Sequence, residues 1–102
     1  MISVIIHITL AFAGRPARDF CTYEKAILLP GPPFPGLHIF FVGANTTGDI
    51  IAGEGEPGIE SRITWNTDIG QYVVENVDFR FEQAQETRAR FLDWGFTERA
   101  GQ

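Results

Sequence analysis

Glu75 is the residue whose type and surroundings come closest to a catalytic pattern. Val73 and Val77 lie two positions away on either side, so in an unbroken strand all three side chains share one face. A carboxyl group in such an apolar row loses hydration, which raises its pKa and makes it a usable general base. Three further side chains could line a ligand-binding pocket around it: Tyr72, Trp65 and His38.

The same segment has a second interpretation, in which Glu75 is exposed. Tyr72 and Val74 are in step with each other, whereas the apolar residues after Asn76 are one position out of step. A β-bulge at residues 75–76 would bring five apolar side chains onto one face: Tyr72, Val74, Val77, Phe79 and Phe81. We favour the bulge, and a buried Glu75 could also simply pair with an arginine. No catalytic residue is therefore assigned from the sequence.

The histidine, cysteine and acidic side chains form no metal-binding motif. His7, His38 and Cys21 fall in three different predicted strands, without the local spacing of zinc ligands. An acidic loop region carries four oxygen donors: Asp49, Glu54, Glu56 and Glu60. It lacks the repeated Asp/Asn pattern of a calcium loop, so we interpret it as solvated. We expect no metal and no cofactor.

Charge and cysteine content narrow the class of partner. The 102 residues carry a formal net charge of -5, and the eight Lys and Arg residues are scattered. This distribution argues against nucleic acid and against an anionic membrane surface as partners. Cys21 is the single cysteine, so no internal disulfide can form, and the expected location is cytoplasmic. The length predicts a single domain over residues 1–102.

A strand over residues 2–12 organises the chain. Its apolar residues occupy the even positions, with only Ile5 breaking the rule: Ile2, Val4, Ile6, Ile8, Leu10 and Phe12. Such alternation is typical of a strand in an antiparallel sheet with one buried face. Residues 20–29 follow a polar turn and begin with β-favouring side chains. This favours a second strand of a hairpin over the alternative, a helix begun by Pro16.

Residues 37–42 suggest that the sheet has two apolar faces. They are apolar at every position except His38, which predicts a central strand covered on both faces. One helix covers only one face of a small sheet, so a second face would remain for another chain. The sequence therefore predicts a homodimer whose interface includes Ile5, Phe40 and Val42.

The remaining segments complete an α+β pattern. Residues 30–36 form a proline-rich connector, and strands are expected at residues 49–52, 59–66 and 71–81. A helix is predicted over residues 82–94, which contain no Gly or Pro. Gly95 supplies the left-handed residue that ends it, and Phe96 falls where it can meet Phe91 in a Schellman stop. Residues 97–102 are expected to be a polar tail.

The order of these elements and a few short motifs carry a resemblance. The motifs are the connector ending at Leu37, the strand segment Ile63-Thr64-Trp65, and the helix ending Leu92-Asp93-Trp94-Gly95-Phe96. With them the chain resembles small uncharacterised bacterial proteins of the integron gene-cassette type. The resemblance implies an α+β fold, a bacterial source and self-association, and it carries over no catalytic residue.

We therefore predict an α+β fold: a curved antiparallel sheet of five to six strands with one C-terminal helix packed on one face. The first functional hypothesis is a non-enzymatic interaction or binding protein that acts as a homo-oligomer through the second face of the sheet. The alternative is a small-ligand binder, or a small acid–base enzyme, with a cleft between sheet and helix around Glu75.

Overall fold

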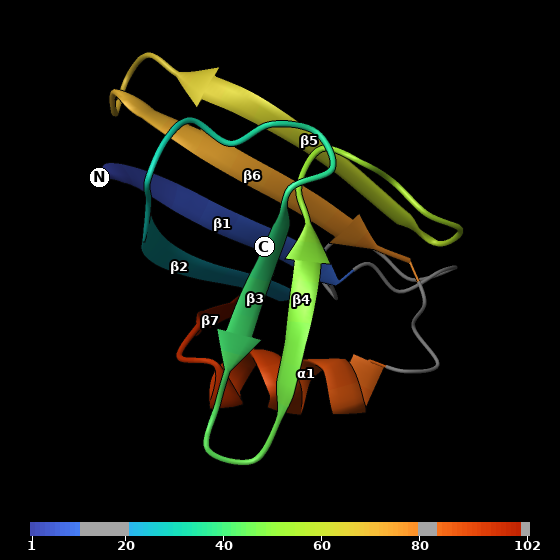
Figure 1. The fold of residues 1–102 in the computed structure, drawn as a ribbon. Helices are drawn as coiled ribbons and strands as arrows, with labels where there is room; N and C mark the ends of the chain where they lie inside the picture. The colour runs from blue at the N-terminus through green and yellow to red at the C-terminus, as the bar shows by residue number, and fades with distance from the viewer. Residues whose placement is uncertain (11–20, 80–83, 101–102) are drawn as a thin grey trace.

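Strand β1 (Ile2–Leu10) lies at the centre of a five-stranded sheet with the order β5-β6-β1-β2-β7 (Figure 1). The other strands of this sheet are β2 (Cys21–Leu29), β5 (Ile59–Asn66), β6 (Gln71–Asp78) and β7 (Thr97–Ala100). The structure is a computed structural model, and it describes residues 1–10, 21–79 and 84–100. The predicted α+β class is confirmed, since one short helix near the C-terminus accompanies the strands.

The alternation in β1 determines which face of the sheet is buried. Val4, Ile6, Ile8 and Leu10 are at most 4% exposed, whereas the odd-numbered residues between them are half-buried. Burying four such side chains contributes roughly 6–12 kcal/mol before the cost in conformational entropy, at ~1.5–3 kcal/mol each. We call the side of the sheet that carries these residues the core face and the opposite side the open face.

The predicted hairpin is confirmed, but the sheet is mixed. β2 pairs antiparallel with β1 from Ile2↔Leu29 to Leu10↔Cys21. β6 pairs with the other edge of β1 in parallel, beginning at Val4↔Tyr72. The parallel pair arises because the chain leaves β2, passes over the core face and re-enters the sheet at the far edge strand, β5 (Figure 1).

Residues 37–42 do not form a central strand, and this expectation is wrong. β3 (His38–Val42) pairs with β4 (Thr47–Ile51) in a separate two-stranded hairpin that lies across the core face (Figure 1). Burial alternates along β3, so Ile39 and Phe41 enter the core while Phe40 is 65% and Val42 is 71% exposed. The hairpin has only one covered face, and apolar composition alone did not reveal this.

Helix α1 (Ala84–Asp93) packs on the core face beside the hairpin (Figure 1). Its predicted Schellman stop is confirmed: Gly95 has φ +83°, and the Phe96 N–H donates to the Phe91 carbonyl at 3.0 Å. The two rings at this stop lie 5.3 Å apart. The start of the predicted helix, at residues 82–83, lies outside the described residues. No helix in the described ranges has the length and apolar character needed to cross a membrane.

The predicted polar tail is an edge strand over part of its length. β7 pairs antiparallel with the first half of β2, from Cys21↔Ala100 to Glu24↔Thr97. The Tyr23 hydroxyl reaches Glu98 at 3.3 Å, and Arg88 of α1 pairs with the same carboxylate at 2.9 Å. Burial, helped by Glu98, raises the pKa of the Tyr23 hydroxyl. The segment forms a strand despite its polar composition, because the backbone edge of β2 that faces away from β1 is free to pair with it.

The favoured bulge in β6 is also wrong. The ladders on both sides of β6 run without interruption through residues 75–76. The core face therefore carries every second residue of the strand: Tyr72, Val74, Asn76 and Asp78. Val73, Glu75 and Val77 point to the open face. The last predicted positions of this strand, 80 and 81, lie outside the described residues.

Candidate functional site

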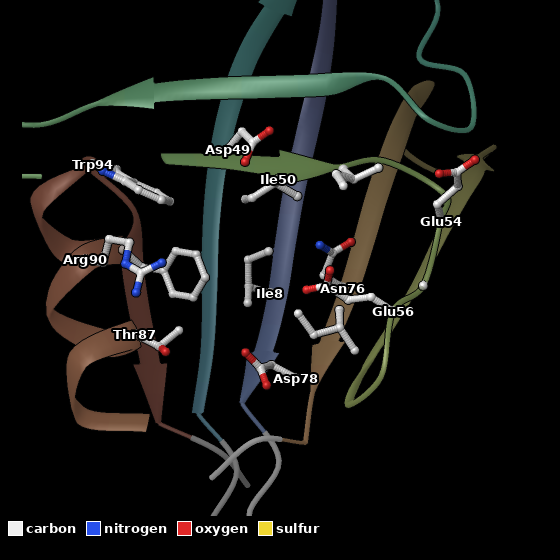
Figure 2. A pocket seen from close by; sticks show the side chains of 14 residues that line it. Ile8, Asp49, Ile50, Glu54, Glu56, Asn76, Asp78, Thr87, Arg90 and Trp94 are labelled. Carbon is white, nitrogen blue, oxygen red and sulfur yellow. The ribbon is translucent and has the colours of Figure 1, made fainter. Parts of the chain in front are cut away.

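A cavity of about 130 Å³ remains where the sheet, the hairpin and the helix meet (Figure 2). Ile8 of β1 lies at its floor, and Ile50 of β4 and Ile59 of β5 add apolar surface. Phe91 and Trp94 of α1 form the opposite wall, and the loop between β4 and β5 closes the side nearest Glu56. The site therefore combines an apolar floor with an aromatic wall, the usual composition of a small-molecule pocket.

Polar side chains enter this apolar space from β6 and α1. Asn76 is 9%, Asp78 7% and Thr87 7% exposed, and all three line the cavity. Asn76 and Asp78 are there because period two in β6 continues from Val74 onto the core face. Polar residues on the buried face of a sheet lower the stability of the core. Because proteins tolerate such a cost mainly at functional sites, these positions are frequently functional.

Ser61 holds one side of the cavity in place. Its Oγ accepts a hydrogen bond from the Gly53 N–H at 2.9 Å and donates one to Asn76 Oδ1 at 2.6 Å. Gly53 has φ +71°, and a Cβ there would lie 3.0 Å from Ile63. The β4–β5 loop is thereby fixed to β5, and the Asn76 amide is held in a single orientation.

Asp93 holds the other side, by joining the end of α1 to the β3–β4 turn. Its carboxylate accepts bonds from Thr46 Oγ1 at 2.7 Å, the Thr46 N–H at 2.9 Å and the Asn45 N–H at 3.1 Å. The Thr46 hydroxyl, followed by the Asn45 N–H, lowers the pKa of Asp93. Trp94 Nε1 donates to the Thr46 carbonyl at 3.3 Å, and the Trp94 ring stacks on Phe41 with centroids 5.3 Å apart. We call these contacts the Asp93 clamp.

Charged side chains of both signs belong to the described lining of the cavity. Glu54, Glu56 and Asp78 carry carboxyl groups, and Glu56 and Asp78 have interaction partners of their own. Asp49 also belongs to the lining, but its carboxylate pairs with His38. Arg90 supplies the one cationic side chain in that described lining, and its guanidinium lies 5.9 Å from the centroid of the Trp94 ring.

The four residues predicted to surround a ligand are not brought together. Trp65 and Tyr72 meet edge to face at 4.9 Å, away from the cavity, whereas His38 pairs with Asp49 at 2.5 Å on the outer side of the hairpin. Glu75 lies on the open face, where it forms an ion pair with Arg62. A cleft between sheet and helix is present, but neither Glu75 nor the other three residues line it.

The three residues predicted for an interface fall on two surfaces. Ile5 is half-buried on the open face of the five-stranded sheet. Phe40 and Val42 lie on the outer side of the hairpin, beside a groove that Leu28 also lines. A single contact surface through the second face of the sheet cannot include all three.

Metal ligands do not converge in the part of the chain that the structure describes. No group of three or more His, Cys, Asp or Glu side chains is placed there to hold a metal ion. Cys21 is a half-buried free cysteine that packs against the core.

The sequence contained a signal for these lining residues. Tyr72, Val74, Asn76 and Asp78 are spaced by two, so an unbroken strand places two polar side chains on the core face. The bulge interpretation obscured the core-face positions of Asn76 and Asp78, because it placed the apolar residues of this segment together on one face. Thr87 and Arg90 could be found only once the position of α1 was known.

No protein-family model, curated protein or solved structure matches the chain. The resemblance to proteins of the integron gene-cassette type therefore stays a prediction.

Proposed function

We propose that this protein is a non-enzymatic binding protein that holds a small organic molecule in the cavity between the sheet, the β3–β4 hairpin and α1. One observation supports this most directly: the buried Asn76 side chain faces an unfilled space of about 130 Å³ floored by Ile8 (Figure 2). Cores are normally filled to crystal-like density. A bound ligand would restore that density over the apolar floor and beside Asn76.

The two walls explain how such a site persists without a ligand. The Ser61 contacts hold the β4–β5 loop away from the floor, and the Asp93 clamp holds α1 and the hairpin together. Each wall is therefore braced by hydrogen bonds outside the cavity, which opposes collapse of the apolar surfaces onto each other. A site formed in advance loses less entropy on binding than one that must be ordered.

A cavity-filling substitution tests the proposal. Ile59→Trp places a large ring in the lining of the cavity, and Ile59 is only half-buried, so the folded state can adapt. A library of single-ring compounds would be screened by two-dimensional amide NMR. We expect hits whose shifts map to β1, β6 and α1, and we expect Ile59→Trp to weaken them at least about tenfold, a loss of about 1.4 kcal/mol.

Ile69→Trp is the matched control, since Ile69 is exposed in the turn between β5 and β6. It should leave the affinity of every hit unchanged. The proposal fails if no compound shifts signals of the cavity lining, or if both tryptophan variants weaken binding equally.

A second candidate function, self-association, is favoured by the outer side of the hairpin. Leu28 is 62%, Phe40 65% and Val42 71% exposed, and all three line one groove between β2 and β3. Within the described residues β3 pairs with β4 on one side only, so that part of the chain leaves its other backbone edge available. We propose that a second copy of the chain pairs there, because two antiparallel β3 strands centred on Phe40 would bring the same residues together from both copies.

The solution mass of two variants tests self-association. Phe40→Asp should convert a dimer, with twice the 11.4 kDa of one chain, into a monomer in light scattering after size-exclusion chromatography. Phe34→Asp, which alters a similarly exposed phenylalanine in the β2–β3 connector, should leave the dimer intact. A wild-type monomer at high concentration would contradict the proposal.

The resemblance and the single cysteine supply two further proposals. We propose a bacterial source and a cytoplasmic location, where the half-buried Cys21 thiol would stay reduced.

A further inference from the structure

We infer that the cavity selects an uncharged, hydrocarbon-like molecule with a single ring, and that apolar contacts alone hold it. The inference rests on the proposed binding function and specifies the ligand class of that same site. Three features of the cavity support it: its buried polar atoms already have partners, its exposed charged side chains lie at the rim, and its space has the size of one ring.

The buried polar atoms of the lining already have partners within the protein. Asn76 Oδ1 accepts a hydrogen bond from the Ser61 hydroxyl at 2.6 Å, and Asp78 and Thr87 have interaction partners as well. In the part of the chain that the structure describes, no buried side-chain nitrogen or oxygen atom lacks a hydrogen-bond partner. A polar group that a ligand buries here would therefore lose its hydration without meeting a group that needs a partner, and this cost weakens binding.

The exposed charged side chains lie at the rim of the cavity, and its floor is apolar. Figure 2 shows Arg90 on α1 and Glu56 on the β4–β5 loop at opposite sides of the space, with Ile8 between them. Both charged side chains are exposed, whereas Ile8 is 2% and Ile50 6% exposed. A charged group of a ligand would be desolvated against these two isoleucines, so the interior favours an uncharged molecule.

The size of the space indicates one ring. Its volume of about 130 Å³ is close to the roughly 150 Å³ of an engineered apolar cavity in another protein that holds benzene. Phe91 and Trp94 lie edge to face at 5.8 Å and add aromatic surface to the wall. Flat rings make favourable offset or edge contacts with such surfaces, so a single aromatic ring fits both the volume and the wall.

Ile50 of β4 limits the size of the ligand. Its side chain is 6% exposed and lines the cavity. Its partner across the hairpin ladder, Ile39 of β3, is 7% exposed but does not belong to the lining. The two isoleucines therefore form a matched pair, because truncation of either one leaves a hole in the core, whereas only truncation of Ile50 enlarges the cavity.

Two probes of nearly identical shape test the preference for a hydrocarbon. Isopropenylbenzene and benzamide are both flat single rings with a branched substituent of the same size, and only benzamide carries polar atoms. Their affinities for the full wild-type chain would be measured by NMR titration at pH 7. We expect isopropenylbenzene to bind at least about tenfold more tightly, because benzamide gives up hydration that the interior does not replace. Benzamide should still give saturable shifts, since its ring fits the space.

Naphthalene tests the limit of one ring. We expect it to bind the wild-type chain at least about fivefold more weakly than isopropenylbenzene, although both are hydrocarbons. Ile50→Ala should raise the affinity of naphthalene relative to isopropenylbenzene at least about tenfold, whereas Ile39→Ala should keep the wild-type order. Should either alanine variant not fold, Ile50→Val and Ile39→Val provide the same comparison with a smaller change of volume, and the shift is expected in the same direction.

The outcomes distinguish the ligand class from the binding function. If benzamide binds as tightly as isopropenylbenzene, or if truncation of Ile50 and of Ile39 changes the order of the probes equally, the inference is overturned while the cavity remains a binding site. If none of the three probes shifts signals of the cavity lining in the wild-type chain, both the inference and the proposed function fail.

Discussion

At Gly43 the backbone of the hairpin lies against the carboxylate at the end of α1. A Cβ at this position would lie 2.2 Å from Asp93 Oδ2, and a Cβ at Gly48 would lie 2.9 Å from the Trp94 ring. Neither glycine has a positive φ, so conformational freedom does not explain them. These residues are required because they let the helix and the hairpin approach closely enough to form one wall of the cavity.

Gly43→Ala is therefore expected to destabilise the protein. The methyl group would push Asp93 away from Asn45 and Thr46, and strain of this kind costs about 1–3 kcal/mol. Gly31→Ala is the control, because a Cβ there meets nothing within 4 Å. Urea unfolding at pH 7 measures both, and equal stability of the two variants would show that the close approach at Gly43 is unimportant.

Single residues show both the strength and the limit of prediction from the sequence. Period two identified the buried positions of β1 correctly, because the apolar and polar residues there separate cleanly. In β6 the separation fails at Asn76, and the sequence could not say whether the strand bulges or the core contains a polar group. The apolar neighbours of Glu75 in the sequence favour a catalytic interpretation, but the open face supplies Arg62 as its partner.

Among the elements, α1 and the hairpin depend on each other through the Asp93 clamp. Because the bonds from Thr46 and Asn45 stabilise the carboxylate form, the pKa of Asp93 is lower in the folded chain than its ordinary value of 3.8. A group with a lowered pKa stabilises the folded state above its unfolded pKa. That contribution is lost as the pH falls through the lower, folded pKa.

Asp93→Asn should therefore remove part of the loss of stability in acid. We expect the free energy of unfolding of the wild-type chain to fall between pH 5 and pH 2 by more than that of the variant, with the curves converging at the acid end. Urea unfolding across this range provides the comparison, with Asp68→Asn in the β5–β6 turn as the control. Parallel curves for wild type and Asp93→Asn would contradict the assigned role of the clamp.

Elements with a local signature were predictable, and those defined by distant partners were not. The Schellman stop at Gly95 requires only the last residues of α1 and was found from the sequence. The place of β3 depends on whether it joins the large sheet or pairs only with β4, and nothing within its five residues distinguishes these. The parallel pairing of β1 with β6 depends on the path of the chain between them.

Across the whole molecule, the two faces of the five-stranded sheet have different roles. The core face carries the hydrophobic core and the cavity, under the hairpin and α1. The open face carries pairs of polar side chains across neighbouring strands, including Arg62 with Glu75 and His7 with Glu24 at 3.7 Å. Such pairs are suited to water, so we assign the proposed self-association to the outer side of the hairpin.

Binding of a small ring compound in the cavity over Ile8 is tested most directly by a benzamide titration followed by methyl NMR. We expect saturable shifts of the Ile8 and Ile50 methyl signals, with the Val77 methyl signals on the open face unchanged. Shifts confined to Val77 and other open-face residues, or no saturable shift at all, would contradict it.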